Sequence, residues 1–328
     1  MSTAKLVPET WELDDDDARR TLVATGRVRL MKDAFVRLRV ADGFSHARSL
    51  AFMTSLVAIQ GLIALVGFAS LLGEDGLSEV IVRAIHDAAP GPAGRLLTQA
   101  VVQAQQNGAG HRLDALILGL LGSLIAGTTA MGQLERALNR LYGIEQDRPS
   151  VQKYALAFVL ALTAGTLGAG AFATLAFGRS IGDSLNKGWL STTWNACRWP
   201  LGLVLTGAAV TMLLRWCPRR HQPSPSWLAF GSVVSVVLWA AVTAGLAWFF
   251  SFSASFGQTY GPLAGMVALL IWALLSAIAV LYGAAVAAQL EAVRAGAAQP
   301  QDVSKVAESE PDSTTSARRG EVAHQAAR

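Results

Sequence analysis

The stretch His221–Leu290 contains no Asp, Glu, Lys or Arg. Soluble domains carry about 25% charged residues, whereas this chain carries 15%. The hydrocarbon core of a bilayer is about 30 Å thick, and one helix crosses it with about 20 apolar residues. The stretch is therefore long enough for two crossings, separated by the polar turn at residues 251–262. This pattern predicts a polytopic membrane protein, and it removes the ionisable groups that many pumps use inside the bilayer.

Six apolar blocks of spanning length follow one another along the chain. They cover residues 50–72, 115–131, 154–177, 199–216, 227–250 and 263–288. Every backbone polar group in lipid must be paired internally, and the blocks lack the alternation of barrel strands. We therefore expect an all-α fold, a six-transmembrane-helix bundle, within a membrane domain at residues 27–292. Residues 1–26 and 293–328 are polar, and we expect them to form disordered tails.

Basic residues gather on one side of the predicted spans. They precede the first span and fill the second and fourth connections: Arg27, Arg29, Lys32, Arg37, Arg39, Arg48, Arg136, Arg140, Arg148, Lys153, Arg215, Arg219 and Arg220. Such a bias marks the cytoplasmic side. We therefore expect a multi-pass membrane protein with both termini in the cytoplasm. No secretory signal pattern precedes the first span, so we expect that span to be an uncleaved anchor.

Two further segments outside the spans have helical patterns. Residues 27–45 predict a basic amphipathic helix in the membrane interface. Its apolar face consists of Val28, Met31, Phe35 and Leu38, and its basic residues would contact anionic headgroups. The loop 73–112 contains two more helical patterns, which we expect to cap the outer end of the bundle.

Small and neutral polar residues recur within the predicted spans. The glycines that could bring helices close together are Gly119, Gly122, Gly127, Gly165, Gly168, Gly170, Gly261 and Gly265. Bundle packing explains them, and a hinge or a lined cavity is the alternative. Gln60 lies in the middle of the first span, where it either ties helices together or lines a polar cavity.

The sequence lacks the motifs of common catalytic sites. There is no phosphate-binding loop, no clustered histidine motif and no nucleophile elbow. We therefore expect no enzyme activity, no cofactor and no bound metal. Cys197 and Cys217 lie near opposite ends of the fourth span, about 30 Å apart along a helix. A disulfide requires Cα atoms within about 7 Å, so these two cannot pair within one chain.

Three stretches, taken together, have a recognisable order and spacing. They are Ser49–Thr54, Ala137–Gly143 followed by Arg148 and Pro149, and Thr259–Gly265 leading into Leu270–Ser276. They resemble the YihY/BrkB family of bacterial inner-membrane proteins, over roughly residues 27–292. The second stretch contains Asn139, which becomes a candidate functional residue.

The chain departs from the family pattern at two places. Gln60 stands where relatives often have proline. The stretch Gly283–Gln289 lacks the acids of the family's G-A-E-x-N-A-E pattern, so a role for those acids cannot operate here. These differences resemble a YhjD-like branch.

The resemblance implies an envelope protein whose biochemical activity is not settled. Relatives are linked to envelope integrity, movement of lipids or lipopolysaccharide precursors, and serum resistance. The family was once labelled ribonuclease BN, but a metal-dependent nuclease needs convergent ligands that this sequence does not supply.

Three functions remain open at this point. We prefer transport or flipping of a lipid or another amphiphile. A scaffolding protein that moves nothing is the alternative, and a membrane enzyme has the least support. The expected partners are membrane lipids, with a second copy of the chain or other envelope proteins as further alternatives, and no nucleic acid.

The segment Thr259–Pro262 opens the sixth span and is a candidate joint at the mouth of the bundle. Pro262 suits a first helical turn, and Gly261 permits close contacts. Tyr260 can keep its ring in the headgroup region, and Gly265 offers a flat face to a neighbouring helix. An ordinary outer turn is the alternative.

Overall fold

The computed structural model describes residues 2–10, 15–71, 79, 81–82, 85, 89, 91–108, 112–184, 188–252 and 262–302. In this part of the chain, six helices are long and apolar enough to cross a membrane. They are α3 (Gly43–Leu71), α6 (Arg112–Leu141), α7 (Ser150–Ser184), α8 (Gly188–Trp216), α9 (Pro225–Phe252) and α11 (Pro262–Arg294). The predicted all-α fold with six spanning helices is confirmed.

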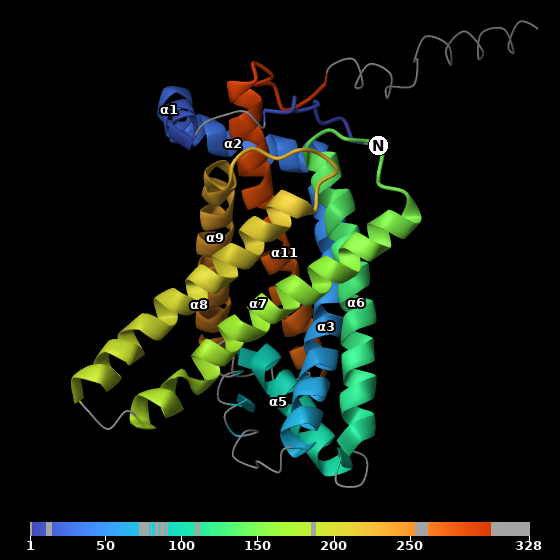
Figure 1. Ribbon diagram of the computed structural model, residues 1–328, viewed down its shortest axis with the longest axis vertical. Coiled ribbons are helices and arrows are strands. Elements are labelled where there is room, and N and C mark those ends of the chain that lie inside the picture. Colours follow the sequence, from blue (N-terminus) through green and yellow to red (C-terminus); the bar gives the residue numbers. More distant parts are fainter. Residues whose placement is uncertain are drawn as a thin grey trace, which may run out of the picture.

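The bundle has two unlike ends (Figure 1). At one end, here named the terminal end, lie α1 (Asp15–Thr25), α2 (Arg27–Val40) and the described terminal residues 2–10 and 295–302. At the other end, the distal end, lies α5 (Gly91–Gly108). Helices α7 and α8 pack on each other and run obliquely, so that their distal ends stand apart from the remaining helices. We name this pair the oblique hairpin.

The closest helix packing joins α3 and α6. A Cβ atom added at Gly119 would lie 2.5 Å from the backbone nitrogen of Ala64, and one added at Gly67 would lie 2.6 Å from that of Leu116. Glycine at these positions lets the two backbones approach closely, which is how helices adhere in lipid. The packing interpretation of the glycines in the second predicted span is therefore confirmed for Gly119.

The glycines of α7 do not pack in this way. A Cβ atom added at Gly165, Gly168 or Gly170 would meet nothing within 4 Å. Bundle packing is therefore the wrong interpretation for these three residues. The physical reason is that this part of α7 lies away from the helices against which its glycines could pack.

Two large hydrophobic cores, and a small cluster of Val7, Tyr142, Ala288 and Ala292, stabilise the described residues. The larger core lies at the terminal end and receives Leu160 from α7 and Leu213 and Leu214 from α8. The smaller core lies at the distal end, where Val66 of α3, Leu97 of α5 and Leu269 of α11 are buried. Among its described members, the distal core contains no residue of α7 or α8. Among the described residues, the hydrophobic core that the oblique hairpin shares with the bundle therefore lies near the terminal end.

Helix α2 differs from its sequence-based prediction. It ends at Val40, and Leu38 is buried, but Val28 and Phe35 remain 69% and 49% exposed. The face that packs on the bundle instead contains Leu30, Ala34, Arg37 and Leu38. Placing Arg37 among headgroup-facing residues was wrong, because tertiary contacts bury it completely.

The terminal segments also differ from the predicted disordered tails. Residues 2–10, here named the strap, lie across the terminal end and bury Ala4 and Val7. The backbone N–H of Val7 donates to Tyr142 O at 3.0 Å, and that of Lys5 donates to Pro300 O at 3.0 Å. Buried apolar side chains and paired backbone groups hold these residues in place. Residues 303–328 lie outside the described part of the chain.

Candidate functional site

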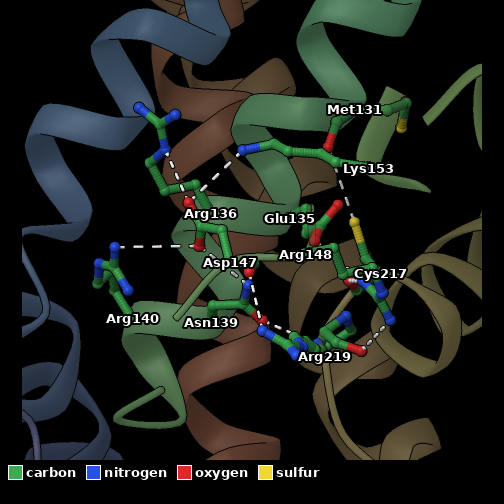
Figure 2. Close-up of polar contacts among 11 residues, drawn as sticks. Met131, Glu135, Arg136, Asn139, Arg140, Asp147, Arg148, Lys153, Cys217 and Arg219 are labelled. Carbon is green, nitrogen blue, oxygen red and sulfur yellow. Dashed lines mark hydrogen bonds and ion pairs between the residues drawn. The ribbon is translucent and has the colours of Figure 1, made fainter. Parts of the chain in front are cut away.

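Polar side chains from two connections converge at the terminal end (Figure 2). They come from the last turns of α6, from the α6–α7 connection with the start of α7, and from the segment that follows α8. We name this group the terminal clamp; its members are Glu135, Arg136, Asn139, Arg140, Asp147, Arg148, Lys153, Cys217 and Arg219.

Local sequence explains how α6 presents its part of the clamp. Glu135 and Asn139 are four residues apart, as are Arg136 and Arg140, so each pair lies on one side of the helix. Gly143 then ends the helix with a φ of 76°, a conformation that glycine adopts without steric cost. This turn directs the following connection back toward the last turn of α6.

Asn139 is the organising residue of the clamp. It is fully buried, and its Oδ1 accepts a hydrogen bond from the Arg219 backbone nitrogen at 2.8 Å. Its Nδ2 donates to Asp147 Oδ1 at 3.2 Å. One amide thus joins α6 to both connections. A functional role for Asn139 stays a prediction.

Asp147 is surrounded by basic side chains. Its carboxylate contacts Arg136 Nε at 3.3 Å, Lys153 Nζ at 3.6 Å and Arg140 Nη2 at 3.9 Å. Burial by itself raises the pKa of Asp147, but the hydrogen bond from Asn139 and the neighbouring positive charges lower the pKa below its ordinary value. Asp147 is therefore ionised at neutral pH, and it forms ion pairs with these three cations just before the start of α7.

Arg148 joins the two connections directly. Its Nη1 lies 3.1 Å from Glu135 Oε1 and donates to Cys217 O at 2.7 Å, and its Nη2 donates to Pro218 O at 2.9 Å. Glu135 is only 1% exposed, and this guanidinium is the cation that pairs with its carboxylate. Burial raises the pKa of the Cys217 thiol, which keeps it protonated. The clamp therefore fixes the terminal ends of α7 and α8 to α6.

A second polar group lies beneath the strap. We name it the strap cluster, and its members are Arg37, Tyr142, Arg220, Gln289 and Glu291. Arg220 Nη2 lies 2.6 Å from Glu291 Oε1, and Arg37 Nε donates to Gln289 Oε1 at 2.7 Å. The Arg220 guanidinium carbon lies 4.6 Å from the centre of the Tyr142 ring, within cation–π range.

The strap closes this cluster with its own acceptors. Lys5 O accepts a hydrogen bond from Arg37 Nη1 at 3.0 Å, and Pro8 O accepts one from Arg220 Nη2 at 3.0 Å. The Thr10 hydroxyl donates to Glu291. The strap therefore covers side chains that carry opposite charges.

The other predicted site residues lie elsewhere. Gln60 lies on the α3–α6 seam, where a Cβ atom added at Gly122 would come 2.9 Å from its Cδ. This position favours the helix-tying interpretation of Gln60. Pro262 is the first residue of α11, as its role in a first turn requires. Tyr260 and Gly261 lie outside the described residues.

Gly265 has the close neighbour that sequence analysis predicted. A Cβ atom added at Gly265 would lie 2.8 Å from Leu96 Cβ and 3.1 Å from Pro92 O, both in α5. The structure therefore separates the predicted site residues, with Asn139 at the terminal end and Gly265 at the distal end.

Sequence analysis missed several residues of the two polar groups. It counted Arg37, Arg148 and Arg219 as markers of membrane orientation, directed Arg37 toward the headgroups, and used Arg148 otherwise only as part of the family motif. The signal that could have revealed some of them is an acid directly followed by arginine within a basic connection, as at Asp147 and Arg148. Within the described part of the chain, no three His, Cys, Asp or Glu side chains are arranged to hold a metal ion.

Six apolar helices, with a buried polar clamp at one end, define a polytopic helical membrane protein. Residues 34–308 match the family described as virulence factor BrkB, and the chain belongs to this family. The predicted family resemblance is thereby confirmed. No solved structure matches the chain.

Three relatives show how the chain compares with curated proteins. The putative ribonuclease-like protein YfkH of Bacillus subtilis is 25% identical over 79% of this chain and 94% of its own length. A UPF0761 membrane protein of Halorhodospira halophila is 25% identical over 76% of this chain and 54% of its own. A UPF0761 membrane protein of Methylibium petroleiphilum is 30% identical over 55% of this chain and 42% of its own length. The chain thus spans about half the length of the UPF0761 relatives.

Proposed function

We propose that this protein moves an amphiphile, a lipid or a related envelope molecule, between the leaflets of a bacterial inner membrane. The terminal end, with both termini, faces the cytoplasm in this proposal. The basic residues of the clamp and of α2 support that orientation, because cytoplasmic ends of spans carry an excess of Lys and Arg.

The observation that carries the proposal is the unequal attachment of the oblique hairpin. Its terminal end is tied to α6 through Arg148 and Asn139 and contributes to the buried core there. In the middle of α7, beyond that core, the exposed glycines Gly165 and Gly168 have no close neighbours, and Trp189 at the distal start of α8 is 70% exposed. Segments with few buried contacts open at low free-energy cost. A hairpin held at one end can therefore separate from the bundle at the other.

Such a movement suits an amphiphile better than a small ion. An amphiphile can keep its acyl chains in the bilayer while its headgroup passes along helix faces. The hairpin offers neutral hydroxyls such as Thr163 and Thr166, both of which bond their own helix backbone. Apolar side chains beside them, such as Val204, which is 65% exposed, suit contact with lipid chains.

Reconstituted vesicles test the proposal. The purified protein is placed in vesicles with a trace of fluorescently labelled phosphatidylglycerol, and a membrane-impermeant quencher reports how fast label crosses. We expect the label to cross faster than in protein-free vesicles. In vesicles with the Asn139→Ala variant, whose fixed end is loosened, we expect the label to cross more slowly than with the native protein. Thr129→Ala is the control, because Thr129 is on the same helix and bonds only its own backbone.

Crossing at the protein-free rate, in vesicles that contain folded protein, would contradict the proposal and favour the scaffolding alternative.

The orientation of the protein in the membrane needs a separate measurement. Cys217 is buried and Cys197 is exposed, so Cys217 cannot report the cytoplasmic side. In a variant whose native cysteines are replaced by serine, Arg27→Cys should react with an impermeant maleimide only after cells are permeabilised. Equal reaction in intact cells would reverse the proposed orientation.

A further inference from the structure

The strap cluster holds more hydrogen-bond donors than acceptors. The side chains of Arg37 and Arg220 are buried. Among the described residues, Arg37 Nη2 and both Nε and Nη1 of Arg220 have no hydrogen-bond partner. A guanidinium offers five N–H donors in a fixed plane, so unused donors on two buried arginines are costly to leave unpaired.

The cluster also carries an excess positive charge. Two guanidiniums face one carboxylate, Glu291, because the side-chain partner of Arg37 is the neutral amide of Gln289. Burial, and to a smaller degree the charge of Arg220, lower the pKa of Arg37 to about 10, so Arg37 stays charged at neutral pH. The excess is one positive charge, buried beneath the strap.

We propose that the strap cluster is a binding site for a monoanionic oxyanion of the phosphodiester class. Arginine recognises phosphate oxygens through paired N–H donors, which are the groups left unused here. A single negative charge matches the excess. Glu291 Oε2, which also lacks a partner in the described structure, disfavours a dianion, because its own charge would repel one.

The strap explains how the site can be covered when no anion is bound. It gives the arginines two neutral carbonyl acceptors, Lys5 O and Pro8 O. A phosphodiester offers stronger acceptors of the same kind. Anion and strap therefore compete for Arg37 Nη1 and Arg220 Nη2, and anything that weakens the hold of the strap favours the anion.

Binding measurements test this site without reference to flipping, so its failure is distinguishable from failure of the proposed function. The full-length protein in a non-ionic detergent is titrated calorimetrically with three probes. They are short-chain phosphatidylglycerol, short-chain phosphatidylcholine and inorganic phosphate. We expect phosphatidylglycerol to bind more tightly than phosphatidylcholine. Tight binding of inorganic phosphate as well would identify a free anion as the source, and weak binding would identify a lipid headgroup.

Three substitutions make the test specific. Gln289→Glu neutralises the excess charge and should weaken phosphatidylglycerol binding about tenfold or more, equivalent to about 1.4 kcal/mol. Thr10→Ala loosens the strap and should tighten binding several-fold, a gain that misfolding cannot produce. Arg27→Gln removes a positive charge from an exposed position of α2 and should leave binding unchanged.

The proposal would be overturned if neither anion binds. It would also be overturned if Arg27→Gln weakens binding as much as Gln289→Glu, since general attraction to a basic surface would then explain the result. Unchanged binding in Thr10→Ala would contradict competition with the strap.

Discussion

The two ends of the oblique hairpin differ in what holds them. At the terminal end, Arg148 and Asn139 join the hairpin to α6 and to the connection after α8. Away from that end, Gly165 and Gly168 in the middle of α7 have no neighbour within reach of a Cβ atom, and Trp189 at the distal start of α8 is 70% exposed. Exposed apolar side chains cost little free energy in lipid, so membrane helices associate through close backbone packing and polar contacts. The hairpin has both kinds of contact at its terminal end and neither at Gly165 and Gly168, which is why we expect motion to be localised beyond the terminal end.

Loss of Arg148 should weaken the terminal end most. Arg148→Ala would leave Glu135 as a buried, unpaired charge, which costs about 3–5 kcal/mol. We expect a large drop in the thermal unfolding temperature and in the amount of protein in the membrane. Arg215→Ala is the matched control, because Arg215 is exposed at the end of α8. An unchanged unfolding temperature in Arg148→Ala would show that the clamp does not stabilise the hairpin.

Removal of the Asn139 amide should have a smaller effect. Asn139→Ala leaves the Arg219 N–H without its acceptor and removes one donor from Asp147. A lost buried hydrogen-bond partner costs about 1–3 kcal/mol. Equilibrium unfolding in detergent measures the change, with Thr129→Ala as control. Equal stability of the two variants would rule out an organising role for Asn139.

Substituting alanine for two glycines, one closely packed and one on an open surface, compares the cost of an added Cβ atom at the two kinds of position. Gly119→Ala forces a Cβ atom against the backbone of α3, and overpacking of this kind costs about 1–3 kcal/mol. Gly168→Ala meets nothing and should change stability by no more than about 0.5 kcal/mol. If Gly168→Ala is the more harmful of the two, the distal half of the hairpin is packed after all.

Acid should weaken the clamp slightly. The pKa of Asp147 is lower in the folded protein than its ordinary value of 3.8. Such a group contributes stability above its unfolded pKa, and the contribution is lost as the pH falls through the folded pKa. We therefore expect the stability difference between the native protein and Asp147→Asn to shrink below about pH 4. A difference that is constant from pH 7 to pH 3 would contradict an ionised Asp147 in the clamp.

Much of the fold could be predicted because hydropathy alone specifies a spanning helix. The apolar stretch His221–Leu290 indicated two crossings, and it became α9 and most of α11. The partners of the polar residues could not be predicted in this way. Asn139 bonds Arg219, which lies 80 positions away, and Arg37 bonds Gln289, which lies 252 positions away. Such pairings depend on which connections meet in space.

Counting basic residues was informative but incomplete. The same arginines that suggest a cytoplasmic side also hold the structure together, as Arg148 does through Cys217 O and Pro218 O. The ordered structure of the strap could not be predicted for a related reason. Its composition is polar, but Ala4 and Val7 are buried and its backbone is paired with distant segments.

The most direct test measures distances at both ends of the hairpin by pulsed electron–electron double resonance. Spin labels are placed on a variant lacking both native cysteines. One pair, Trp189 and Trp248, reports the distal end, and the other, Val151 and Arg39, reports the terminal end; all four positions are exposed. The account predicts a broad or multi-peaked distance distribution for the distal pair and one narrow peak for the terminal pair. Two equally narrow distributions, or a broader one at the terminal end, would contradict it.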